Sequence, residues 1–187
     1  MTKRKSIPYI ALLIAFALWM YIKPEKESPA LSEHHPSYIA DKVASNHYDQ
    51  FGFNDYRIFS EKMTSYPGKE VTFFEGPKVI VYIKDKETDV VTVWQLTSLN
   101  GALKEKHTLV LTGEVLIENL SEDQLVQKML TDEATVLLDS KEVTTDSKVT
   151  WSGPQIQQEG VGMWISMNTE EMTLKSHTKA VYLNEPK

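Results

Sequence analysis

The chain has 187 residues, no cysteine and a formal net charge of −6 at pH 7. This length is typical of one domain with a substantial core, and the lack of cysteine excludes disulfides and cysteine-ligated zinc. All 26 acidic residues and 17 of the 20 basic residues lie beyond Ile22, which leaves that part with a net charge of about −9. This acidity argues against nucleic acid or an anionic membrane surface as its partner.

Residues 7–22 form an uncharged apolar run that follows the basic segment Lys3–Lys5. A helix of this length spans roughly 24 Å, and Trp19 and Tyr21 could extend it towards the interfaces of a hydrocarbon core of roughly 30 Å. The other interpretation, a cleaved signal peptide, lacks a small-residue cleavage site after the run. We therefore predict a cytoplasmic N-terminus (1–6), one transmembrane helix (7–22) and an exported remainder.

Residues 23–47 contain three prolines and several serines with little periodic hydrophobicity, which predicts a linker. The adjacent His34 and His35 have no third ligand in register, so we expect solvated side chains and no metal site. The folded domain is then expected to span residues 48–187.

From Tyr48 onward, short β-rich segments alternate with turn signals. A first hairpin is predicted to bend at Gly52 or at Asn54-Asp55, the segment 66–69 is a Pro-Gly turn, and Asn100-Gly101 is a two-residue hairpin signal. Residues 121–130 could begin a helix, but their all-β surroundings favour a strand at 127–131. The other predicted strands are 56–60, 71–74, 79–83, 90–96, 108–111, 114–117, 134–138, 148–151, 155–157, 161–167, 172–175 and 178–183.

A β-rich run with one glycine recurs along the chain. Gly113 interrupts the run 107–119, where a lone glycine marks a bulge, a bend or a close backbone approach. The same layout surrounds Gly76, 37 residues earlier, and Gly153, 40 residues later.

The later copies depart from this spacing. The third copy is longer, with an insertion near 140–145, and Gly160 and Gly162 bracket a further predicted turn. A fourth copy starts near Ser166 and stops before its glycine. Repeated short strands predict an all-β protein, an open antiparallel β-sandwich or jellyroll. The last strand is then left as an edge that another protein's strand can join.

Catalytic motifs are missing from the sequence, including Gly-x-Ser-x-Gly, a phosphate-binding glycine loop and His-Glu-x-x-His. Residues 176–179 match Ser-x-x-Lys but lack the partner motifs Ser-Asp-Asn and Lys-Thr-Gly. Acidic clusters in the predicted turns are better explained by solvated loops than by paired acid and base carboxylates. We expect no enzyme activity, no cofactor and no bound metal.

Methionine and aromatic residues are frequent in the predicted strands. Methionine adapts its shape, which suits an irregular apolar cavity, although an ordinary sandwich core explains the same composition. In the alternative, two sheets hold lipid chains between them, and an anionic lipid is gripped by its acyl chains. The residues concerned are Met63, Met129, Met163, Met167, Met172, Phe51, Phe53, Phe59, Phe73, Phe74, Trp94, Trp151 and Trp164.

Several loose motifs, in their order and spacing, resemble the LptC family of the lipopolysaccharide export machinery. The resemblance runs over nearly the whole chain, including the basic start and the single span, and is weakest in the linker and the membrane run. The motifs are 51–57, 71–77, 93–94, 111–115, 131–134 and 151–153.

The resemblance implies transport without catalysis. In that family the inner-membrane transporter LptBFG extracts lipopolysaccharide and passes it to the jellyroll, which hands it to the periplasmic bridge protein LptA. It implies a single-pass inner-membrane protein whose bulk is periplasmic. It implies acyl-chain contacts from inward side chains: Phe74, Met172 and Tyr182, with Ile58, Val81, Val115, Ile117 and Ile165 as neighbours.

The same resemblance implies docking edges at both ends of the jellyroll. The N-terminal strands near 48–53 would face the transporter, and the family's bend glycines map to Gly52 and Gly153. The joint to LptA would involve Thr178, Lys179, Ala180, Val181, Tyr182 and Leu183. Two alternatives stay open: a docking subunit that recruits LptA without carrying lipid, and a lipid-modifying enzyme that uses Ser176 and His177.

Overall fold

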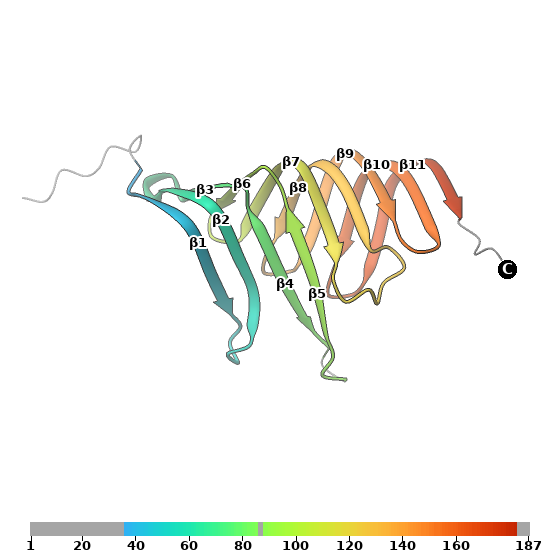
Figure 1. The fold of residues 1–187 in the computed structure, drawn as a ribbon, viewed down its shortest axis with the longest axis horizontal. Helices are drawn as coiled ribbons and strands as arrows, with labels where there is room; N and C mark the ends of the chain where they lie inside the picture. The colour runs from blue at the N-terminus through green and yellow to red at the C-terminus, as the bar shows by residue number, and fades with distance from the viewer. Residues whose placement is uncertain (1–35, 86–87, 183–187) are drawn as a thin grey trace, which may run out of the picture. The chain divides into compact units, whose positions relative to one another are not determined.

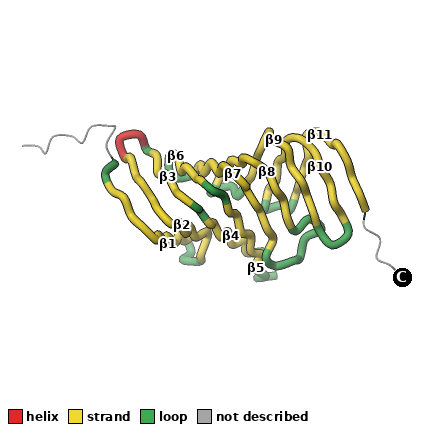
Figure 2. Tube along the Cα trace, turned by 45° about the horizontal axis from the view of Figure 1, so that its top comes forward, coloured by secondary structure: helices red, strands yellow, loops and turns green. Residues whose placement is uncertain are grey.

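The computed structural model describes residues 36–85 and 88–182, and most of them lie in β-strands (Figure 2). The predicted all-β fold is confirmed. No helix within these described ranges is long and apolar enough to cross a membrane, and the predicted span at residues 7–22 lies outside them. The elements are β1 (Tyr38–Tyr48), β2 (Asn54–Tyr66), η1 (Pro67–Lys69), β3 (Val71–Glu75), β4 (Lys78–Lys84), β5 (Val91–Thr97), β6 (Asn100–Lys104), β7 (Thr108–Asn119), β8 (Lys128–Leu137), β9 (Glu142–Ser152), β10 (Ile156–Ser166) and β11 (Glu171–Tyr182).

The strands form one antiparallel sheet that folds into two leaves. The first half of β2 pairs with β4, then β5 and the second half of β7 follow; we call this leaf I. The second half of β2 pairs with β3, then β6 and the first half of β7 follow; this is leaf II. Strands β8 to β11 continue the stack and contribute one half to each leaf, so β1 and β11 lie at its opposite ends (Figure 1).

A line of backbone irregularities separates the two leaves. Gly113 has a φ of +79° and lies where the β7–β8 register shifts, and Gly162 has a φ of +74° where the β9–β10 register shifts. Leu99 links two of the repeated glycines, because its N–H donates to the Gly113 carbonyl and its carbonyl accepts from Gly76 N–H. These bulges turn long strands from one leaf into the other. Of the bulge, bend or close approach predicted at Gly113, the structure shows a bulge, and the strands predicted at 108–111 and 114–117 are the single strand β7.

Gly153 does not lie on this bend, which corrects the expectation of three equivalent copies. It follows β9 in the turn to β10, where its N–H donates to the Ile156 carbonyl. A Cβ there would lie 2.0 Å from the carbonyl oxygen of Leu125. In this half of the chain Gly162 occupies the bend, so the recurring glycines serve two different purposes.

The bend also explains why the sequence predicts too many short strands. The predicted pairs 127–131 with 134–138, 155–157 with 161–167, and 172–175 with 178–183 are single bent strands: β8, β10 and, as far as residue 182, β11. The turn predicted at Gly160 and Gly162 is therefore wrong. A bulge interrupts the alternation of inward and outward residues within one strand. In the sequence, this interruption looks like a turn between two strands.

Two further boundaries differ from the predictions. Asn100-Gly101 opens β6 and makes no hairpin, because β5 pairs with β4 and β7 whereas β6 pairs with β3 and β7. The first strand begins at Tyr38, so the linker cannot extend to residue 47. Strand β1 pairs with β2 over its length but contains no buried side chain, which leaves no hydrophobic alternation to detect.

Other local predictions are confirmed. Gly52, with a φ of +86°, lies in the turn between β1 and β2. Pro67–Lys69 form the 3-10 turn before β3. Residues 121–127 form no helix, and the strand predicted after them begins at Lys128.

Candidate functional site

The inner faces of the two leaves share one apolar interior. Across leaf II, Met63, Phe74, Gly101 and Leu111 are successive register partners and face this interior. Across leaf I, the corresponding inward partners are Ile58, Val79, Leu96, Ile117 and Met129. The interior is thus a row of side chains that continues from β2 towards β11.

The structure brings most of the predicted lipid-contacting residues together. Ile58, Phe74, Val81, Val115, Ile117 and Ile165 belong to one buried cluster, and Met172 packs against it. The side chain of Tyr182, at the end of β11, lies outside the described residues.

The middle of the interior is filled. Leu96, Leu111, Ile117, Met129 and Met163 all have 0% relative exposure. Close packing of this kind leaves no space for an added chain without movement of the surroundings. A lipid chain that passed here would have to separate the two leaves, and the flexible methionines would ease the repacking.

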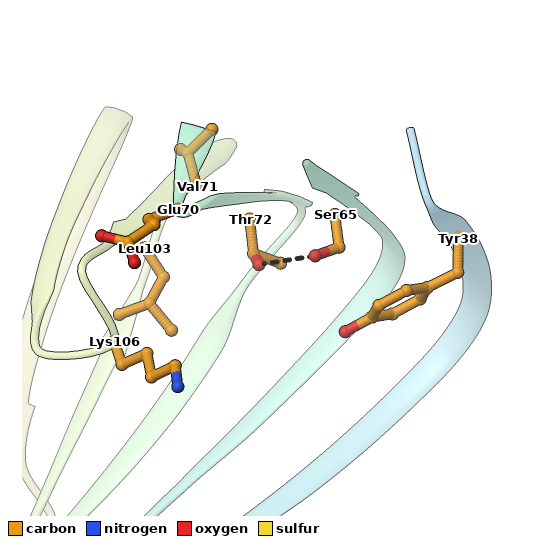
Figure 3. Close-up of a pocket in the computed structure, with 7 residues that line it drawn as sticks. All are labelled: Tyr38, Ser65, Glu70, Val71, Thr72, Leu103 and Lys106. Carbon is orange, nitrogen blue, oxygen red and sulfur yellow. Dashed lines mark hydrogen bonds between the residues drawn. The ribbon is translucent and has the colours of Figure 1, made fainter. Parts of the chain in front are cut away.

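The N-terminal end of leaf II has a groove with a volume of about 410 Å³ (Figure 3). Tyr38, Ser65, Thr72 and Leu103 line it as register partners on β1, β2, β3 and β6. These four positions lie in the same inward register as Ile165 and Met172 further along the stack. The groove therefore lies in line with the inward side chains of leaf II, and Leu109 and Val136, the next residues in this register, are buried.

The groove combines apolar walls with a charged rim. The Ser65 and Thr72 hydroxyls lie 3.3 Å apart and form a hydrogen bond with each other. Because they satisfy each other, a hydrocarbon chain can lie against them without leaving either hydroxyl unpaired. Leu103 and Val71 add apolar surface, and the rim carries Glu70 and Lys106 (Figure 3). Such a groove can hold a chain inside and present an ammonium group to an anionic head group at the rim.

Most groove residues were not found from the sequence. Tyr38 lies in the segment that was expected to be a linker. Thr72 lies two residues before Phe74 and therefore on the same face of β3, so strict alternation from the predicted lipid contact would have identified it. Lys106 lies in a turn, where sequence gives no direction for its side chain.

A polar cluster lies at the rim of leaf I, by which we mean the end of the leaf that is farthest from the bend. The Asp123 carboxylate accepts a 2.7 Å hydrogen bond from the Thr92 hydroxyl and a 2.8 Å hydrogen bond from the Asn119 amide. Asn119 is buried, and its side-chain oxygen has no partner among the described residues. This cluster fixes the loop between β7 and β8 across the ends of β5 and β7.

Both ends of the stack present a strand edge. Among the described strands β11 pairs with β10 alone, and β1 pairs with β2 alone. The predicted docking residues Thr178–Tyr182 form the second part of β11, where Tyr182 is the register partner of Ile156. Leu183, the last predicted docking residue, lies outside the described residues.

The two glycines singled out by the resemblance have different surroundings. Gly52 needs its positive φ, yet an added Cβ would meet nothing within 4 Å. Gly153 has no positive φ but lies against the backbone of the β7–β8 loop. Both lie in rim turns of leaf I, and neither faces the apolar interior.

The sequence is similar to known proteins of lipopolysaccharide assembly and export. The sequence matches the family described as "Lipopolysaccharide-assembly, LptC-related" over residues 10–183. It is 25% identical to the lipopolysaccharide export system protein LptC of Haemophilus influenzae, covering 92% of this chain and 91% of that protein. It is 22% identical to LptC of Escherichia coli K12, covering 92% of this chain and 88% of that protein.

Among solved structures, the chain matches LptH, the LptA homologous periplasmic component of the lipopolysaccharide transport device of Pseudomonas aeruginosa. That match has 13% identity and a TM-score of 0.46, and it covers 70% of this chain and 95% of that one. The family match extends over most of the chain. The chain therefore belongs to the LptC-related family of lipopolysaccharide-assembly proteins.

Proposed function

We propose that this protein accepts lipopolysaccharide from the inner-membrane transporter LptBFG and passes it to LptA, with the acyl chains held between the two leaves. Family membership gives the chain its role in lipopolysaccharide transport. The observation that carries the proposed route is the apolar interior, which runs from Ile58 and Phe74 near the first strands to Leu174 on the last. Nonpolar walls favour acyl chains, because transfer of hydrocarbon out of water is favourable at about 25 cal/mol per Å².

The N-terminal groove is the proposed point of admission. It lies beside β1, the strand nearest in sequence to the predicted membrane span, and it opens onto the inward register that continues to Met172. The chain has no strong positive face to hold a phosphate-rich head group, since its part beyond Ile22 carries a net charge of about −9. Binding of the lipid through its acyl chains is consistent with this negative net charge.

The two edge strands are the proposed docking surfaces. Unpaired backbone N–H and C=O groups at a sheet edge accept a strand from another protein. On this proposal β1 and the following turn meet the transporter, and Thr178–Leu183 meet LptA. The stack would then continue across the joint, so that the interior of one protein leads into the next.

Residues 7–22 are the proposed single membrane anchor, with residues 1–6 in the cytoplasm and the β-structure in the periplasm. The linker in this proposal ends before Tyr38, where β1 begins. No catalytic step is required of the chain, because moving lipopolysaccharide between two binding interiors breaks no covalent bond.

One observation favours the alternative of a docking subunit that carries no lipid. The middle of the interior is completely buried, as in an ordinary sandwich core. The two functions differ in whether acyl chains ever reach the inward side chains during transport, and neighbouring residues on one strand can separate them.

Phe73 and Phe74 are such a pair. Phe74 is 4% exposed and faces the interior, whereas Phe73 is 48% exposed on the outer face of β3. A photo-crosslinking amino acid at Phe74, tested with the transporter turning over ATP, should capture lipopolysaccharide, and the same probe at Phe73 should capture little.

The outward position controls for capture that does not depend on the interior, and a thermal melt of both variants controls for the probe's effect on folding. Equal capture at both positions, or capture at neither, would contradict the interior route and leave the docking subunit as the better account.

A further inference from the structure

The rims of the two leaves touch at one place far from the bend. Asp55 is the second residue of β2 and lies at the outer end of leaf I. Lys141 ends the turn between β8 and β9, at the outer end of leaf II. Lys141 Nζ lies 2.6 Å from Asp55 Oδ1, so an ion pair crosses the mouth between the leaves.

This ion pair is unusually sheltered. Each of its two side chains is 16% exposed, whereas every other ion pair of the described residues has at least one side chain more than half exposed. A sheltered pair is less screened by water and salt than an exposed one. Salt therefore weakens its attraction less than that of the pairs on the outer surface.

The turn that carries Lys141 is fixed to leaf II on both sides. The N–H of Leu138 donates to the His107 carbonyl at 2.9 Å, and the N–H of Met167 donates to the Lys141 carbonyl at 3.0 Å. The Asn168 side chain donates to the Ser140 carbonyl. Lys141 itself has a φ of +57°, a conformation that a residue with a side chain adopts only when its surroundings impose it.

A second contact supports the meeting of the rims. Tyr56 follows Asp55 on β2, and its phenol is half-buried. Burial, then the carboxylates of Asp139 and Asp55, raises the pKa of this phenol. Asp139 lies in the same turn as Lys141, so two neighbouring residues of leaf I face two residues of the β8–β9 turn.

We propose that Asp55 and Lys141 form a clasp across the mouth of the jellyroll, closed when no lipid is bound and opened by each lipid chain that passes between the leaves. This rests on the proposed function, because the fully buried interior admits a chain only if the leaves separate. Separation breaks the 2.6 Å contact.

An ion pair suits such a reversible joint. When the rims part, both charges regain their hydration, and this offsets much of the lost attraction. An apolar contact at the same place would expose hydrocarbon to water each time it opened. The clasp thus keeps the interior shut in the absence of lipid and opens at modest cost when acyl chains occupy the interior.

Locking the clasp tests the proposal. The chain has no cysteine, so Asp55→Cys with Lys141→Cys introduces the sole thiols, which a short bis-maleimide can join. The matched control is Glu118→Cys with Lys128→Cys, which replaces an ion pair between neighbouring strands β7 and β8. Each full-length protein is reconstituted with transporter and LptA, before and after crosslinking.

Lipopolysaccharide transfer to LptA should fall about tenfold or more when Asp55→Cys/Lys141→Cys is crosslinked, because productive loading scales with the fraction of open molecules. Crosslinking the control pair should leave transfer nearly unchanged. Lys141→Met removes the ion pair, so this variant should capture lipopolysaccharide even without ATP. The charge exchange Asp55→Lys with Lys141→Asp restores an ion pair and should make capture depend on ATP again.

Two unfavourable results have different meanings. Capture of lipopolysaccharide at Phe74 that is equally strong with the clasp free and crosslinked would overturn the clasp alone. No capture at Phe74 even with the clasp free would overturn the interior route, and the clasp proposal would fall with it.

Discussion

Glycines 52 and 153 show how one residue type meets two physical demands. At Gly52 the backbone has a φ of +86° in open surroundings, so the demand is conformational. At Gly153 the Leu125 carbonyl occupies the place of a side chain, so the demand is steric. Both residues lie in turns at the outer end of leaf I.

Replacing each glycine by asparagine separates these demands. Asparagine tolerates a positive φ, so Gly52→Asn should change the free energy of unfolding by no more than about 0.5 kcal/mol. Gly153→Asn must displace the β7–β8 loop and should destabilise by about 1–3 kcal/mol or more. Urea denaturation of the purified proteins measures both, and equal losses would contradict this assignment.

Tyr56 predicts a pH dependence of stability. Its pKa is raised above the ordinary value of 10.0 in the folded protein, so the folded state keeps a proton that the unfolded state releases. The stabilisation is complete below about pH 10 and is lost as the pH rises through the raised pKa.

Tyr56→Phe removes this term, so its stability should fall less steeply than that of the unmodified protein between about pH 9 and pH 11. Absorbance titration should also show that Asp139→Asn lowers the pKa of Tyr56. Identical pH slopes for the two proteins would mean that the pKa of Tyr56 is not raised, and an unchanged pKa in Asp139→Asn would mean that the phenol does not face the β8–β9 turn.

At the scale of elements, the bent strands decide what the sequence could predict. Runs such as 71–74 and 79–83 are rich in β-branched and aromatic residues, end at turn signals, and were predicted almost to the residue. Alternation fails where a strand crosses the bend, so β8, β10 and β11 each appeared as two pieces. The exposed strand β1 is held by backbone pairing alone, and hydrophobic pattern carries no information on such pairing.

The candidate site also has one part that was expected from the sequence and one part that was not. Inward residues such as Ile117 and Ile165 were expected from the family resemblance, and the structure gathers them in one buried cluster. The Asp55–Lys141 contact joins residues 86 positions apart on different leaves, and it depends on how the leaves cross. No local pattern of residue types encodes that geometry.

The edge of β11 can be tested by proline substitution. Along an edge strand, successive N–H groups point alternately to the paired neighbour and to the free side. Of Lys179→Pro and Ala180→Pro, one should therefore break a hydrogen bond to β10 and lower the melting temperature. The other should keep its melting temperature and lose binding to LptA.

The measurement pairs a thermal melt with a pull-down on LptA for each variant. Leu96→Pro, in β5 and paired on both sides within the sheet, serves as a control for destabilisation without an edge effect. Full binding by both β11 variants would show that LptA does not join this strand.

At the scale of the whole molecule, two leaves joined along one bend give an apolar interior with a mouth opposite the bend. Strand edges at both ends allow the stack to continue into partner proteins, and the interior lies on the path between them. On the proposed function, the protein acts as a passage whose walls are its own core. Its stability and its transport capacity would then depend on the same buried side chains.

The centre of the stack is where transport and simple docking differ most. Ile117 is fully buried there, and its neighbour Leu116 points to the outer face of β7. A photo-crosslinker at Ile117 during ATP turnover tests the central claim most directly. We expect ATP-dependent capture of lipopolysaccharide at Ile117 and little at Leu116; a protein that supports export with no capture at Ile117 would contradict the account.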